Sequence, residues 1–183
     1  MSSGARIAAL WRPRLAGARL AIVMLLAVSA SARSHDNLCA DLLSPDARDA
    51  LSNQFPDLYP QRVSDLSAEY QEAWLKEHPQ ECPGIAVGHF QSPSKTSYAV
   101  LLVGSKGSLS GSKLVVMTPN ANATWKVTKL SEESMAYHYE AVSKVSRAKA
   151  RGALDQIRFK EFDGGASTYS WTGARFHKTT VKD

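Results

Sequence analysis

A run of six apolar residues, Tyr98 to Val103, is the feature that most restricts the fold of this 183-residue chain. Apolar side chains at every position, rather than at every second one, are typical of a strand that is covered on both faces. The run therefore predicts a central strand, and the rest of the fold has to supply cover for it.

Segments with strand character lie on both sides of this run. Together with the run itself they give about seven strands, and turn-forming residues separate them. The order is typical of a mainly antiparallel meander. The other expected strands cover residues 85–90, 114–117, 124–130, 157–162, 167–171 and 175–181.

Two short helices are expected before the strands. Ser44 followed by Pro45 is typical of a helix start, and Pro56 ends the helical pattern. A second helix is expected over 67–78, and its aromatic face, which includes Trp74, should pack on the sheet. The sequence predicts a single α+β domain over residues 33–183, with both helices packed on the sheet.

The first 32 residues have the order of an export signal. Four arginines precede the apolar run 20–28, and small residues then lead to an A-x-A cleavage site at Ala32. A membrane anchor, the alternative, needs roughly 20 apolar residues. We therefore expect a cleaved signal peptide over residues 1–32, a periplasmic or secreted protein, and no stable membrane anchor after cleavage.

The positive charge of the chain belongs to this leader. Without its four arginines, the net charge of +5 falls to +1. Nucleic acids and anionic membranes favour clustered positive charge, so neither is expected as a partner.

The two cysteines, Cys39 and Cys82, both follow the predicted signal. An oxidising compartment permits a disulfide between them, which is the interpretation we favour. A zinc site is disfavoured because the cysteines lack close paired spacing, and a reactive thiol is the third alternative. We expect neither a metal nor a cofactor.

A polar loop between two strand segments carries Gly88, Phe90, Lys95 and Tyr98 at set positions. With these residues, segment 84–102 resembles a single FG-GAP or VCBS-like unit, and stretch 169–176 is similar to the hairpin that ends many exported bacterial proteins with one such unit. The resemblance implies a bacterial origin. In that family acidic residues bind calcium in the loop, but calcium takes about six to eight oxygen ligands, many from carboxylates. Here the acidic positions hold His89, Gln91, Pro93 and Ser97.

We therefore expect calcium binding to be lost while the loop geometry is kept. Local turn bonds would then close the loop, with Ser92, Ser94 and Ser97 bonding the nearby backbone.

The sequence contains no catalytic motif, neither a G-x-S-x-G turn nor a helical metalloprotease pattern. One enzyme hypothesis is kept: a small exported hydrolase or glycan-active enzyme whose site is assembled from dispersed residues. Its candidates are His89, His138, Glu140 and His177.

The best candidate binding surface is aromatic. Two-residue spacing places Tyr137 with Tyr139, and Tyr169 with Trp171, on one face of their strands, where core packing is the other interpretation. The favoured hypothesis is a non-catalytic binding module of the bacterial cell envelope that recognises another protein, as an inhibitor, an immunity-type protein or an assembly accessory. A third hypothesis is a scaffold that pairs through exposed strand edges.

Overall fold

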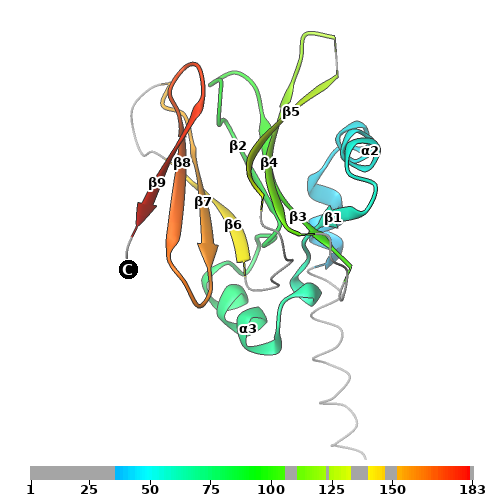
Figure 1. The fold of residues 1–183 in the computed structure, drawn as a ribbon, viewed down its shortest axis with the longest axis vertical. Helices are drawn as coiled ribbons and strands as arrows, with labels where there is room; N and C mark the ends of the chain where they lie inside the picture. The colour runs from blue at the N-terminus through cyan, green and yellow to red at the C-terminus, as the bar shows by residue number, and fades with distance from the viewer. Residues whose placement is uncertain (1–35, 106–110, 123, 133–139, 147–151, 182–183) are drawn as a thin grey trace, which may run out of the picture.

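The computed structural model describes residues 36–105, 111–122, 124–132, 140–146 and 152–181 (Figure 1). The fold is α+β, as predicted, and its layers are visible in Figure 1: helix α2 (Pro45–Gln54), a first sheet, and a second sheet, with helix α3 (Ala68–Glu77) at one end of the second sheet. The described residues form nine strands in two antiparallel sheets.

Strand β3 (Ser97–Gly104) is the centre of the first sheet. One of its sides pairs with β4 (Lys113–Pro119), which in turn pairs with β5 (Trp125–Glu132). Its other side is shared by two short strands: β1 (Leu58–Pro60) pairs with its C-terminal half and β2 (Ile85–Gly88) with its N-terminal half.

The prediction that this strand is covered on both faces is confirmed. Ala99, Leu101 and Val103 belong to the core between the two sheets. Val100 and Leu102 alternate with them and pack beneath the N-terminal helices. All five are at most 1% exposed, so β3 is buried on each face.

The second sheet is a meander of four strands in sequence order. These strands are β6 (Glu140–Val145), β7 (Gln156–Glu161), β8 (Ala166–Trp171) and β9 (Phe176–Val181). Val142, Ile157, Phe159 and Tyr169 pack from this sheet against the first, which makes the two sheets a sandwich.

The prediction of one sheet of about seven strands is therefore wrong in its arrangement. Strand β1 was missed because it has only three residues and contains Pro60, a residue that edge strands tolerate but that gives little strand signal. Strand β6 was missed because its buried positions, Glu140 to Val142, are consecutive and include a charged residue. The division into two sheets depends on pairing between distant segments, which periodicity does not encode.

Both predicted helices are present. α2 (Pro45–Gln54) begins after Ser44, whose Oγ accepts a hydrogen bond from the Ala47 amide at 3.4 Å. Residues 36–42 are also helical, which the sequence did not predict, and Leu43 and Leu51 pack with Val100 on the first sheet.

α3 (Ala68–Glu77) begins after its cap Ser67 and ends at His78, close to the predicted bounds. Its aromatic face packs as expected, with Trp74 buried and Tyr70 stacked on Phe162 at 4.8 Å between ring centroids. It lies with Ala141 on the outer side of the second sheet, so the two helices cover different sheets rather than one.

β1 and β2 form one edge that is interrupted by an excursion, residues 62–83. The amide of Gln61 donates to the Leu101 carbonyl at 2.9 Å, and the Leu101 amide donates to the Gly84 carbonyl at 2.8 Å. The chain therefore stops pairing with β3 after Gln61 and resumes pairing with it at Gly84. The excursion between these residues contains the 3-10 turn η1 (Val63–Asp65) and α3.

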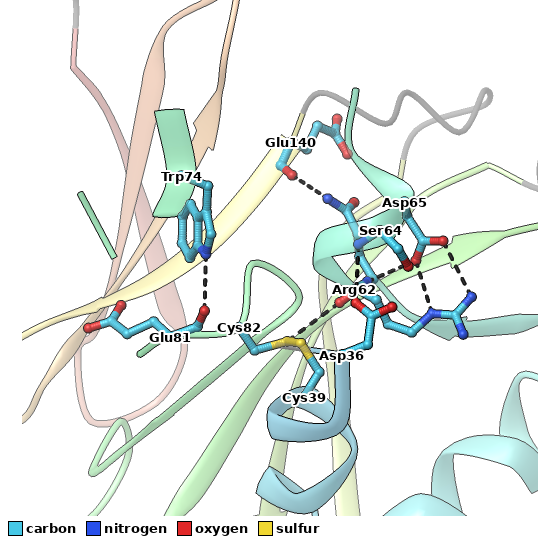
Figure 2. The surroundings of a disulfide bond; sticks show 10 residues. Asp36, Cys39, Arg62, Ser64, Asp65, Trp74, Glu81, Cys82 and Glu140 are labelled. Atoms are coloured by element: carbon cyan, nitrogen blue, oxygen red, sulfur yellow. Dashed lines mark hydrogen bonds and ion pairs between the residues drawn. A yellow bond between two sulfur atoms is a disulfide. The ribbon is translucent and has the colours of Figure 1, made fainter. Parts of the chain in front are cut away.

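The predicted disulfide between Cys39 and Cys82 is confirmed, with 5.1 Å between the two Cα atoms (Figure 2). It joins the helical segment 36–42 to the end of the excursion. A second tie lies close by, where the Ser64 amide donates to Asp36 Oδ1 at 3.1 Å. Across the described part of the chain, no helix has the length and apolarity needed to cross a membrane.

Candidate functional site

The two long sides of the sandwich differ. On one side, β2 lies against β6, and the Val142 amide donates to the Pro83 carbonyl at 2.7 Å. Gln61 Nε2 adds a bond to the Glu140 carbonyl at 2.7 Å. These bonds join the two sheets, so this side is closed.

A reciprocal pair of bonds also ties the sheets at one end. The His89 amide donates to Asp155 Oδ2 at 2.8 Å, and the Asp155 amide donates to the His89 carbonyl at 3.1 Å. A side-chain carbon at Gly88 would lie 2.9 Å from that carboxylate, so the Asp155 side chain would have to shift to admit a larger residue there.

Among the described residues the other side of the sandwich is open, because β5 and β9 are the outer strands of their sheets. Between them lies a hollow of about 300 Å³, which we call the intersheet groove. Its lining comes from β5, from the β8–β9 hairpin and from Gln91. Its aromatic residues are Tyr169, Trp171 and Phe176, and its cations are Lys126, Lys129, Arg175 and Lys178.

Strand alternation explains why these side chains meet. Tyr169 pairs with Lys178 and Trp171 with Phe176, so all four share the face of the second sheet that looks toward the first. In β5, Thr128 pairs with the core residue Val116, and Lys126 lies two residues away on the same face. Polar residues at these inward positions leave the space unfilled by core packing.

The groove combines positive charge with aromatic rings. Among the described residues, no Asp or Glu lines the groove and no carboxylate pairs with Lys126, Arg175 or Lys178. The Lys178 ammonium lies 5.9 Å from the centre of the Tyr169 ring, and Trp171 meets Phe176 edge-on at 5.1 Å. Uncompensated cations beside apolar rings favour an anionic ligand with some apolar surface.

Tyr169 also offers a donor. Its hydroxyl is buried and has no hydrogen-bond partner among the described atoms. Since buried polar groups are nearly always satisfied, this hydroxyl is a position where a ligand oxygen would gain a bond.

A larger hollow, of about 420 Å³, lies between segment 36–42, α2 and β1. Its lining is mostly apolar, and two of its charged residues already have structural partners: Asp36 binds the Ser64 amide and Arg62 lies 3.4 Å from Asp65. One wall of this hollow is segment 36–42, which is the first part of the chain that the structure describes. The smaller groove is therefore the better-defined site.

Two pKa values are shifted beside this larger hollow. Burial raises the pKa of Tyr59 above 10.0, and the charge of Asp65 adds to the rise. For Arg62, burial lowers the pKa, but the hydrogen bonds and charges of Asp65 and Tyr59 together outweigh it, and the net shift is upward.

The predicted aromatic surface is placed in part. Trp171 lies half-buried in the groove, while Tyr169 lines it and also belongs to the intersheet core. Core packing therefore holds for Tyr169, and its role in binding stays a prediction. Tyr137 and Tyr139 lie outside the described residues.

The hydrolase candidates do not come together where the structure describes them. Glu140 is buried on β6, whereas His177 is exposed on β9. Two strands separate them, which corresponds to about 14 Å at ordinary strand spacing. His89 is held at the loop, with Nδ1 3.2 Å from the Lys95 carbonyl, and His138 lies outside the described residues.

The loop after β2 forms part of the predicted turn. Ser92 Oγ accepts from the Ser94 amide at 3.4 Å and lies 3.1 Å from Ser94 Oγ. Ser97 differs from the prediction, because its hydroxyl is buried in β3 and has no partner among the described atoms. Within the described residues, no three His, Cys, Asp or Glu side chains are grouped to hold a metal ion.

Sequence reasoning missed most of the groove. Phe176, Arg175, Lys178 and Lys126 were not singled out, although their alternation with neighbouring residues was a usable signal. That signal acquires meaning only once β5 and β9 are known to face each other. Comparison of the chain with protein-family models, with curated proteins and with solved structures finds no match. The resemblance to an FG-GAP or VCBS-like unit therefore stays a prediction.

Proposed function

We propose that this protein is a non-catalytic, exported binding module of the bacterial cell envelope that recognises another protein through the intersheet groove. The observation that carries the proposal is the convergence of Tyr169, Trp171 and Phe176 with Lys126, Arg175 and Lys178, in a groove where no described residue contributes a carboxylate. Aromatic and arginine side chains dominate protein-recognition surfaces, and cations set the preference for an acidic partner. An inhibitor, an immunity-type protein and an assembly accessory are the three kinds of module that the proposal covers.

Export is part of the proposal. The signal-like order of residues 1–32 supports it, and so does the disulfide, since oxidising compartments are where such bonds persist. A net charge of +1 after residue 32 argues against a nucleic acid, whose binding relies on many phosphate contacts. No observation favours the hydrolase hypothesis.

A charge reversal tests the groove. We expect the protein purified from the periplasm of an expressing bacterium to bind capped Glu-rich peptides. The double variant Arg175→Glu/Lys178→Glu should weaken this binding by about tenfold or more, because two attractive charges become repulsive. Titration calorimetry at low and at physiological salt measures the effect, and added salt should weaken the wild-type complex.

The matched control is Lys144→Glu, an exposed position on β6 away from the groove. It makes one charge reversal without touching the site and should leave affinity within about twofold. Equal affinity of the wild type and the groove variant, or equal weakening by Lys144→Glu, would contradict the proposal.

A further inference from the structure

Strand β9 has one side without a partner strand among the described residues. It is the last strand of its sheet and pairs only with β8 (Figure 1). Its side chains are exposed from His177 to Val181. An open edge of this kind is a template for a further strand.

The hairpin geometry determines which backbone groups face the open side. The Thr172 amide donates to the Arg175 carbonyl at 3.0 Å and closes the turn before β9. Hydrogen-bonded and non-bonded pairs alternate in an antiparallel ladder, so His177 and Thr179 bond to β8. The amides and carbonyls of Phe176, Lys178 and Thr180 therefore point away from β8, toward the open edge.

The same three residues also direct their side chains to the inner face. Phe176 and Lys178 line the intersheet groove, and Thr180 continues their alternation. A strand added at this edge would continue the second sheet toward β5. Its inward side chains would then come next to Lys178 and face the side of the sandwich that carries Lys126.

We propose that an extended acidic segment of the protein partner adds to β9 as an antiparallel or parallel strand, with every second side chain an acid that enters the intersheet groove. The inference rests on the proposed function and specifies how the groove is used. Backbone bonds supply affinity and the cations select acids at alternate positions. The six residues of β9 set the length of the added strand.

Charge argues for this occupant over a second copy of the chain. Pairing β9 with another β9 would bring two edges together that both carry Arg175 and Lys178. Like charges across a strand pair are unfavourable, and lysine on an edge strand is a common protection against self-association. An acidic strand removes that repulsion.

Amide hydrogen exchange tests strand addition residue by residue. The probe is a capped decapeptide in which Glu and Thr alternate, added to the exported protein at saturating concentration. We expect exchange of the Phe176, Lys178 and Thr180 amides to slow by about tenfold or more, because each gains a bonded carbonyl. The amides of His177 and Thr179, already bonded to β8, should change far less.

A pair of substitutions at one position separates backbone from side chain. Thr180→Ala and Thr180→Pro both remove the hydroxyl, but only proline removes the outward amide, and an edge strand tolerates it. We expect peptide affinity to fall by about fivefold or more for Thr180→Pro relative to Thr180→Ala. Thermal unfolding of both variants should show that the fold is kept. Unchanged exchange of the His177 and Thr179 amides in both variants should show that β9 still pairs with β8.

The outcomes are distinguishable. Binding that responds to Arg175→Glu/Lys178→Glu while the three amides stay unprotected would overturn strand addition and leave the proposed function standing. Absence of binding by acidic peptides would overturn both. Protection of these amides that appears without peptide and grows with protein concentration would identify a second copy as the occupant, against our inference.

Discussion

At the scale of single residues, Gln61 and Gly84 hold the point where the edge of the first sheet is interrupted. Gln61 bonds to Leu101 through its backbone and to the Glu140 carbonyl through its side chain. A side-chain carbon on Gly84 would lie 2.2 Å from the Gln61 carbonyl oxygen, far inside van der Waals contact. The clash would involve backbone, which has no rotamer to change.

We therefore expect Gly84→Ala to lower the free energy of unfolding by more than about 2 kcal/mol, because the interrupted edge must separate to admit a methyl group. Urea denaturation followed by circular dichroism measures the change. The matched control is Gly165→Ala, where the nearest atom is the Val181 carbonyl oxygen at 3.4 Å. A similar loss of unfolding free energy in both variants would show that the clash with the Gln61 backbone is not the cause.

Tyr59 gives the fold a dependence on alkaline pH. Its pKa in the folded protein is raised above 10.0, first by burial and then by Asp65, whose carboxylate accepts a bond from the phenol at 3.3 Å. A raised pKa means that the stabilising contribution is present below pH 10 and is lost as pH rises through the folded-state value.

We expect the free energy of unfolding of Tyr59→Phe to fall less steeply than that of the wild type above pH 10, since phenylalanine cannot ionise. Denaturant titrations at pH 8 and pH 11 on both proteins give the comparison. Parallel pH profiles would show that other groups account for the alkaline loss.

At the scale of elements, the disulfide fastens a helical segment that has few other attachments. It joins segment 36–42 to the end of the excursion, and both cysteines are buried. The two cysteines are 43 residues apart in sequence, so opening the bond releases a long loop in the unfolded chain.

The double variant Cys39→Ala/Cys82→Ala should lower the free energy of unfolding by about 4 kcal/mol in the chain-entropy account. Hydrogen exchange should increase first in segment 36–42, since its other anchors are Asp36 and a few apolar contacts. Reduction of the wild type with a thiol is the control and should give a similar loss. A change below about 1 kcal/mol would mean that packing alone holds the segment.

Elements with a strong local signal were predictable from the sequence. Both helices carry serine caps, and the apolar run of β3 indicated its central place. β1 and β6 were not predictable, because their strand character comes from pairing with β3 and β7 rather than from their own residues. The disulfide was predictable because the sequence has only two cysteines.

The candidate site was predictable only in part for a related reason. Spacing alone singled out Tyr169 and Trp171. The cations that complete the groove come from β5 and β9, whose approach is a property of how the two sheets stack. The spacing of apolar residues within β5 or β9 does not predict how the two sheets stack.

At the scale of the whole molecule, the sandwich is joined along one side and open along the other. Gln61, Pro83 and Asp155 bond across the joined side and its end, whereas the open side is formed by two outer strands. Ligand-induced motion should therefore be concentrated in β5 and β9, because the other side is held by hydrogen bonds between the sheets.

The interrupted edge also determines when the protein is able to fold. Synthesis proceeds from the N-terminus, so residues 36–61 are made long before their partners. β1 pairs with the end of β3, and Gln61 bonds to the carbonyl of Glu140. The second sheet, by contrast, pairs each strand with the next one made, which is the arrangement that closes fastest. β1 has no partner until β3 has been made, and Gln61 Nε2 has no acceptor until Glu140 has been made, whereas both cysteines are present once Cys82 has been made. The disulfide is therefore able to form before the first sheet is joined to the second.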